Sequence, residues 1–140
     1  MSELRTAPPV FADQVLRDCF LAFPEVVFAV TGECMSPDLR EGERVRLVSP
    51  ALRAPRLGDV VLTRTGGDLR LHRLVWGPPF ARRAGLRTKA DRAPSFDPAL
   101  GEGDILGTVV AVEGRPYERR LAGALVSLVR ATVRSLRLAR

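Results

Sequence analysis

Cys34 stands where a chain could present a nucleophile. It follows a short β-branched run at 26–31 and precedes a stretch around Ser36-Pro37 that favours a turn. A cysteine at such a junction can hold its sulfur over a cleft while nearby backbone N–H groups point at one spot, as an acyl-transfer nucleophile and its oxyanion require. We take the backbone N–H groups of Glu33 and Cys34 as candidate oxyanion donors. Alternatively, Cys34 is a small buried apolar side chain, which is the commoner role of a free cysteine.

His72 is the only histidine of the chain. Histidine is the side chain whose ordinary pKa lies nearest neutrality, so a histidine base, if there is one, must be this residue. A lone histidine within a strand is otherwise a structural or surface group. One histidine and two separated cysteines are too few for a structural zinc site, and we expect neither a metal nor a cofactor.

Asp91 and Asp97 lie six residues apart in a polar loop. Either could turn inward and hold the imidazole in one tautomer, which is the orienting role of the acid in a catalytic triad. Taken alone, both are equally explained as solvated turn residues. The second cysteine, Cys19, falls on the apolar face of a helix and is expected in the core. We do not expect a disulfide between the two cysteines in a reducing cytoplasm.

Short strands are the elements that must position these side chains. Apolar residues at helical spacing predict one helix over residues 9–22, ended near Pro24. Alternating and β-branched runs then predict strands, and Gly66-Gly67-Asp68 predicts a hairpin turn. Residues 78–85 and 91–103 are expected to be irregular, and 114–116 to break the strand pattern. The pattern predicts a mainly β, antiparallel open sheet or small barrel-like fold. The expected strands are 26–31, 44–48, 59–64, 69–76, 86–89 and 105–113.

The positive charge is concentrated at the C-terminus. The chain of 140 residues carries a net charge of +6, and residues 115–140 hold seven arginines against Glu118, while the rest balances. Residues 118–138 predict one amphipathic helix with an arginine stripe opposite leucine and valine. Its uncharged run is too short to span a membrane. We expect it to dock on the body or a second copy, or to lie on an anionic membrane surface. Nucleic acid is not an expected partner, because the body is neutral and the tail lacks aromatic residues to stack on bases.

Taken in order, these stretches resemble the superfamily that joins type I signal peptidases to the self-cleaving LexA-type repressors. Residues 32–37 (GECMSP) resemble its G-x-S-M-x-P box with cysteine in the serine position. Residues 71–75 (LHRLV) resemble the histidine box of the archaeal, eukaryotic and spore-former branch. The other matching boxes are 39–45 (LREGERV), 57–61 (LGDVV), 88–91 (TKAD) and 105–109 (ILGTV), and the whole match covers roughly 26–113.

The resemblance implies a signal-peptidase/LexA-like antiparallel β fold and a peptidase that processes a peptide or protein precursor. Cys34 would be the nucleophile, His72 its general base, Asp97 the group that orients the imidazole, and Asp91 would assist nearby. The alternative is a catalytically inactive peptidase fold that holds a partner segment. We therefore expect a helical segment at 1–25, a peptidase-like domain at 26–114 and a basic helix at 115–140. The expected location is the bacterial cytoplasm, either free or peripheral on the inner membrane face.

Overall fold

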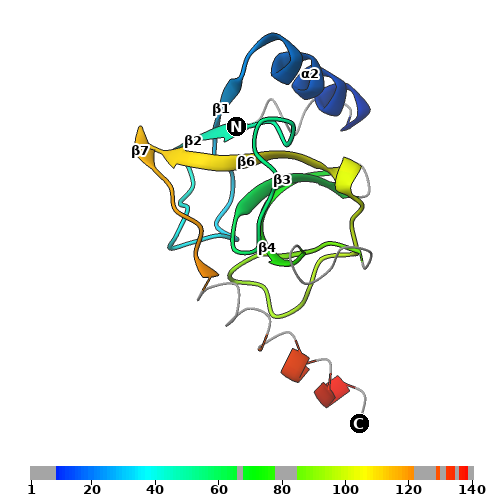
Figure 1. The fold of residues 1–140 in the computed structure, drawn as a ribbon. Helices are drawn as coiled ribbons and strands as arrows, with labels where there is room; N and C mark the ends of the chain where they lie inside the picture. Colours follow the sequence, from blue (N-terminus) through cyan, green and yellow to red (C-terminus); the bar gives the residue numbers. More distant parts are fainter. Residues whose placement is uncertain are drawn as a thin grey trace.

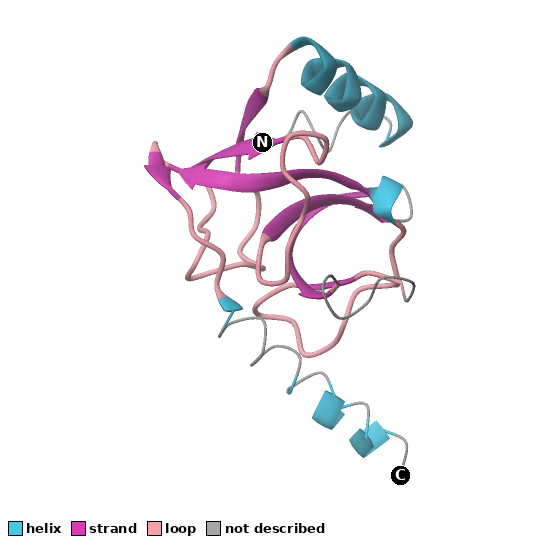
Figure 2. Cartoon of the chain, in the orientation of Figure 1, coloured by secondary structure: helices cyan, strands magenta, loops and turns pink. Residues whose placement is uncertain are grey.

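A single antiparallel sheet forms the framework of the protein. The computed structural model describes residues 9–65, 68–77, 85–121, 129, 132–134 and 136–138. The helix α2 (Pro9–Ala22) precedes the sheet, and its bounds confirm the expected helix. The sheet order is β1-β2-β6-β3-β4-β5, with β7 paired to β6, and every pairing is antiparallel (Figures 1 and 2). The strands are β1 (Glu25–Ala29), β2 (Arg44–Val48), β3 (Val60–Thr65), β4 (Asp68–Trp76), β5 (Arg87–Lys89), β6 (Ile105–Val112) and β7 (Arg115–Pro116), and a 3-10 turn, η1 (Glu102–Asp104), precedes β6. The prediction of a mainly β fold is therefore confirmed.

The strand ends differ from the expected ones where backbone groups find other partners. β1 ends at Ala29, because the backbone of Val30 bonds to the turn before β2: its N–H donates to Glu43 and its carbonyl accepts from Gly42. Residues 115–116 do not break the pattern as expected but form β7. The chain reverses before them through Glu113 and Gly114, both of which have positive φ. The tip of the β3–β4 hairpin (66–67) and most of the expected loop at 78–85 lie outside the described residues.

The core fills the curve of the sheet in two clusters. The larger cluster packs Leu16 of α2 against strand residues such as Leu47 and Val109, and also takes in Met35 and Leu39 from the turn that follows Cys34. The smaller cluster holds Val61, Leu74, Leu86, Leu100 and Ile105. The turn that carries Cys34 is thus anchored in the same core as the sheet.

Helix α2 packs closely on β6 at a glycine. A Cβ added at Gly107 would lie 3.0 Å from Cζ of Phe20 and 3.3 Å from the carbonyl oxygen of Val48. A larger residue at Gly107 would therefore require Phe20 or the neighbouring strand to shift. Of the other expected helix-face residues, Cys19 is only partly buried rather than in the core, and Val15 is 54% exposed. Among the described side chains of α2, Leu16 and Phe20 pack against the core.

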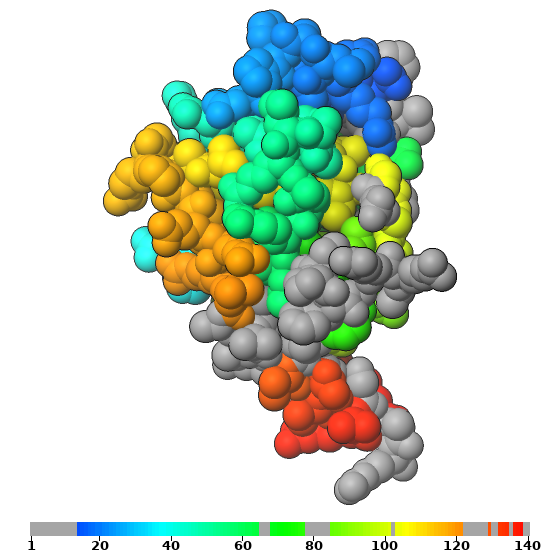
Figure 3. All heavy atoms as spheres, viewed as in Figure 1, coloured from blue at the N-terminus to red at the C-terminus, as the bar shows by residue number. Residues whose placement is uncertain are grey.

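The C-terminal segment crosses the body before it becomes helical. The expected helix at 118–138 is wrong at its start, because residues 118–120 are not helical. The N–H of Tyr117 donates to Val110 at 2.9 Å and that of Arg120 to Gly58 at 3.3 Å, so this segment is bonded to the body. Figure 3 shows this segment, in orange, lying against the β2–β3 loop. Residues 121, 129, 132–134 and 136–138 are helical, and the rest of the expected helix lies outside the described residues. In the described part of the chain, no helix combines the length and the apolar character that crossing a membrane requires.

Candidate active site

Cys34 is held at the start of a tight turn that follows β1. Gly32 has a φ of 77°, in the left-handed region that glycine adopts without strain. The N–H of Ser36 then donates to the carbonyl of Glu33 at 3.0 Å, and that of Leu39 to the carbonyl of Met35. Met35 is buried directly after Cys34, whereas Cys34 itself is exposed. The buried neighbour fixes the turn, and the turn presents the thiol at the surface.

His72 and Asp97 meet across the β4–β5 edge. Nδ1 of His72 lies 2.5 Å from Oδ2 of Asp97, and both side chains are largely buried. The loop that carries Asp97 is fixed by its own backbone, because the N–H of Asp97 donates to the carbonyl of Thr88 at 2.9 Å. The hydroxyl of Thr88 also donates to Oδ2 of Asp97 at 2.8 Å. Asp97 is therefore locked in place by the strand beside His72.

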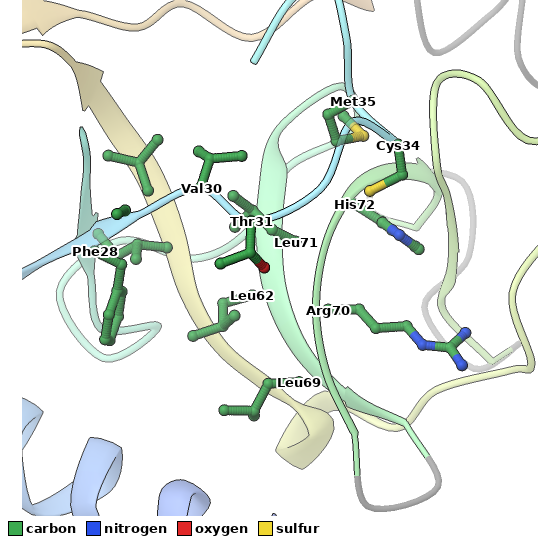
Figure 4. A pocket seen from close by; sticks show the side chains of 13 residues that line it. Phe28, Val30, Thr31, Cys34, Met35, Leu62, Leu69, Arg70, Leu71 and His72 are labelled. Carbon is green, nitrogen blue, oxygen red and sulfur yellow. The ribbon is translucent and has the colours of Figure 1, made fainter. Parts of the chain in front are cut away.

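The thiol of Cys34 completes this array from the other side of the imidazole. Interaction with His72 lowers the pKa of the Cys34 thiol, and Figure 4 shows the sulfur beside the imidazole ring at one end of a pocket. The N–H of Arg92 donates to the carbonyl of Cys34 at 3.0 Å, which joins the cysteine turn to the loop that carries Asp97. The structure thus brings together three of the four side chains that the sequence singles out.

The three groups shift one another's pKa values toward an ion pair. The hydrogen bond from His72 lowers the pKa of the Cys34 thiol, and this outweighs the effect of its partial burial. Burial disfavours the charged imidazole, but the hydrogen bonds to Asp97 and Cys34 raise the pKa of His72 to about 9. Burial would raise the pKa of Asp97, yet the contacts with His72 and Thr88 and the charge of Arg70 hold it below its ordinary value. Near neutral pH these shifts favour a thiolate, an imidazolium and a carboxylate in a row.

Asp91 does not join Cys34, His72 and Asp97. Its carboxylate forms a two-point ion pair with Arg73, with Nε–Oδ1 and Nη2–Oδ2 distances of 2.9 and 2.8 Å. The guanidinium of Arg73 is buried and also donates to Asp38 at 2.7 Å. Asp38 in turn accepts from the hydroxyl of Tyr117 and pairs with Arg120. Asp91 therefore does not assist at the imidazole as expected but joins a buried ionic cluster, because Arg73 offers it a fully desolvated partner.

An apolar pocket of about 220 Å³ opens beside the thiol. One wall is β1 with the residues that follow it, and the other is the β4 segment that ends at His72 (Figure 4). Cys34, His72 and Arg70 are at one side of it. The remaining lining is mainly apolar and includes Phe28, Val30, Leu62, Leu69 and Leu71. The pocket can therefore receive an apolar side chain next to the sulfur.

The proposed oxyanion donors are compatible with this arrangement. Among the described residues, no backbone oxygen or carboxylate accepts a hydrogen bond from the N–H of Glu33 or Cys34. The Cys34 N–H lies near its own sulfur and helps to lower the pKa of the thiol. Their role as oxyanion donors stays a prediction.

The comparisons add no relative. Neither protein-family models nor curated proteins give a match to this chain. The assignment of the site therefore depends on its own geometry. No group of three or more His, Cys, Asp or Glu side chains gathers as a metal site would in the described part of the chain, and both cysteines are free thiols.

Sequence reasoning missed two residues that hold the triad. Nη1 of Arg70 lies 3.7 Å from Oδ1 of Asp97, and Thr88 donates to the other carboxylate oxygen. The sequence did indicate Arg70, because residues two apart in a strand point to the same face and His72 follows Arg70 by two residues. Thr88 lies in the box at 88–91 and Arg73 in the box at 71–75, but the sequence assigned neither of them a role.

Proposed function

We propose that this protein is a peptidase that cleaves a peptide or protein precursor with Cys34 as nucleophile, His72 as proton donor and acceptor, and Asp97 as orienting group. The observation that carries the proposal is the grouping of three side chains: the Cys34 sulfur lies beside the His72 ring (Figure 4), and Nδ1 of that ring is 2.5 Å from the Asp97 carboxylate. A nucleophile, a base and a group that orients the base are the parts that acyl transfer needs.

The chemistry follows from the protonation states. The Cys34 thiolate attacks the scissile carbonyl carbon, and the carbonyl electrons move onto the oxygen, near the N–H groups of Glu33 and Cys34. When the tetrahedral adduct collapses, the C–N bond breaks and the His72 imidazolium gives its proton to the leaving amine. Neutral His72 then takes a proton from water, which attacks the thioester. The sulfur leaves as thiolate, and His72 is again the imidazolium.

Asp97 supports both steps. Its carboxylate accepts from Nδ1, so the proton that moves would be carried on the other ring nitrogen. Its negative charge also stabilises the imidazolium, in line with the raised pKa of His72. Arg70 and Thr88 keep the carboxylate ionised and fixed.

The edge of β1 is the proposed site for the substrate backbone. Among the described strands, β1 pairs with β2 alone, so its other edge is open. The residues that continue β1 toward Cys34, from Phe28 to Thr31, line the apolar pocket. An extended peptide added along this edge would place alternate side chains toward the pocket and its backbone toward the sulfur. The order of the sequence boxes and the mainly β antiparallel fold support the proposal that the chain belongs to the signal-peptidase/LexA-type superfamily.

Cleavage of a peptide library tests the proposal. The native chain and a Cys34→Ala variant would be incubated with a complex mixture of denatured-protein peptides, and new termini would be identified by mass spectrometry. We expect new termini with the native chain alone, with an apolar residue recurring at one position near the cut. A Cys34→Ser variant should keep part of this activity. A mixture left uncut by both the native and the serine form would favour the binding module instead.

A further inference from the structure

A wide groove lies next to the turn that carries Cys34, and its lining shares no residue with that of the apolar pocket. Its volume is about 1040 Å³. One wall is formed by two loops, at Ser36-Pro37 and at 91–94, and the other by the C-terminal helical residues. Neither the peptidase chemistry nor the apolar pocket uses this groove.

The lining of the groove combines positive charge with apolar surface. Arg92, Arg134 and Arg137 line it, together with Val129, Val133 and Leu138. These apolar side chains are 61, 42 and 76% exposed, respectively. Apolar side chains beside exposed arginines suit a partner that has apolar and acidic groups on one face.

Few acidic groups within the protein offset these arginines. Asp91 is the one acidic residue of the lining, and its carboxylate is already held by Arg73. Arg92 makes a surface pair with Glu33 at 3.6 Å, in which both side chains are more than half exposed. Among the described residues, no acidic side chain pairs with Arg134 or Arg137. The charge of the groove therefore remains available to a partner.

The groove and the apolar pocket share the turn that carries the nucleophile. Cys34 and Met35 line the pocket, and the next two residues, Ser36 and Pro37, line the groove. A chain bound in the pocket and passing over Cys34 therefore reaches the groove within a few residues.

We propose that this groove binds an acidic, amphipathic segment of the protein substrate, on the side of the cleaved bond away from the apolar pocket. The identity of the partner as substrate rests on the proposed peptidase function. The groove would then select precursors by a segment outside the cleaved sequence, and the arginine-rich C-terminus would be a substrate-binding element.

Two other partners fit the groove less well. An anionic membrane surface is broad, whereas Val129 and Val133 line a concavity whose opposite wall is the loops beside Cys34. A second copy paired through the same face would bring its own Arg134 and Arg137 against these arginines, and like charges repel.

Binding of synthetic peptides tests the groove without any need for cleavage. The full chain carrying Cys34→Ala would be titrated into a fluorescein-labelled amphipathic peptide of leucine and glutamate, and into the same peptide with lysine for glutamate, with fluorescence anisotropy as the readout. We expect the acidic peptide alone to bind. The double variant Arg134→Glu/Arg137→Glu should weaken that binding about tenfold or more. The matched control is Arg44→Glu/Arg115→Glu, which changes the net charge equally at exposed positions outside the groove and should bind as the parent does.

The proposed role of the groove would be overturned if both peptides bound equally, or if the control pair weakened binding as much as Arg134→Glu/Arg137→Glu. It would also be overturned if no peptide bound and Arg134 and Arg137 were needed instead for sedimentation with phosphatidylglycerol vesicles or for a dimer. Alkylation of Cys34 in the native-thiol chain separates this failure from failure of the proposed function. A reactive Cys34 without peptide binding overturns the groove alone, whereas an unreactive Cys34 with selective peptide binding overturns the peptidase alone.

Discussion

His72 and Arg73 are consecutive residues of β4 that hold the two aspartates of one loop on opposite faces of the strand. His72 binds Asp97 at 2.5 Å, and Arg73 binds Asp91 at 2.8 and 2.9 Å. Because neighbouring strand residues point to opposite faces, this pair fixes both ends of the loop at once. A slip of β4 by one residue would exchange a base for a buried cation, so the pairing register is essential to the site.

The resting ion pair predicts selective alkylation of Cys34. At neutral pH, iodoacetamide should label Cys34 faster than Cys19, because the hydrogen bond to His72 lowers the pKa of the Cys34 thiol and raises its thiolate fraction. A His72→Ala substitution should slow labelling of Cys34 and leave Cys19 unchanged. Peptide mass spectrometry after timed labelling gives both rates. Equal rates for the two cysteines, unaffected by His72→Ala, would disprove the dyad.

The pKa shifts predict how reactivity depends on pH. The thiolate of Cys34 should persist to lower pH in the folded chain than in the urea-unfolded chain, where the thiol regains its ordinary pKa of about 9.0. Cleavage should then fall as pH rises through about 9, because His72 loses the proton that the leaving amine needs. Labelling of Cys34 measured against pH in the folded and the urea-unfolded chain tests the first expectation, and cleavage measured over the same pH range tests the second. Cleavage that keeps rising above pH 9 would rule out the imidazolium as the proton donor.

Substitutions at Asp97 and Asp91 should distinguish the aspartate that orients His72 from the one that stabilises the fold. Asp97→Asn removes the hydrogen bond and the charge that raise the pKa of His72. Loss of the imidazolium should outweigh the smaller direct effect of the Asp97 charge, which raises the pKa of Cys34, so labelling of Cys34 at neutral pH should slow about tenfold, one pKa unit being a factor of ten. Asp91→Asn should leave that rate unchanged but lower the free energy of unfolding by about 3 kcal/mol, because Arg73 keeps only part of its buried pairing. Labelling rates and urea denaturation of both variants decide this. Slowing by Asp91→Asn to the same degree would place Asp91 at the imidazole.

The sequence sufficed for the parts of the site that rest on rare residue types and on strand alternation. His72 is the only histidine, and alternation placed it on one face of its strand with Arg70. Asp91 was misassigned because an irregular loop has no period from which a direction can be inferred. The burial of Arg73 was beyond sequence reasoning, since arginine is usually exposed and its partner Asp38 lies 35 residues away.

The same limit applies to the end of the chain. The apolar and arginine pattern at 118–138 predicts a helix, and residues 132–134 and 136–138 are helical. Residues 117–120 instead bond to Val110 and Gly58, which are distant in sequence. A periodic pattern predicts the local structure of a segment, whereas its docking depends on partners that the pattern does not contain.

Replacing Arg73 should destabilise the protein strongly. Arg73→Met keeps a long side chain but leaves Asp38 and Asp91 without their shared buried cation, and loss of one partner from a buried ionic pair costs about 3–5 kcal/mol. Urea denaturation followed by circular dichroism measures the change. The triple variant Arg73→Met/Asp38→Asn/Asp91→Asn is the control and should recover part of the loss. If Arg73→Met is as stable as the native chain, the buried cluster contributes nothing to holding the loops.

Tyr117 connects this cluster to the C-terminal segment, and Tyr117→Phe should weaken that connection. The tyrosine hydroxyl donates to Asp38 and accepts from Arg73 at 3.2 Å, in a partly buried site. Removing a hydrogen bond to a charged group costs about 1.5–3 kcal/mol. Arg120→Gln breaks a contact with the same carboxylate, but its side chain is 66% exposed, so its loss should cost no more than about 1 kcal/mol. Proteolysis under native conditions, with mass spectrometry of the fragments, should show earlier cleavage after residue 117 in Tyr117→Phe than in Arg120→Gln. The reverse order would mean that Arg120, rather than the tyrosine hydroxyl, holds the segment to the body.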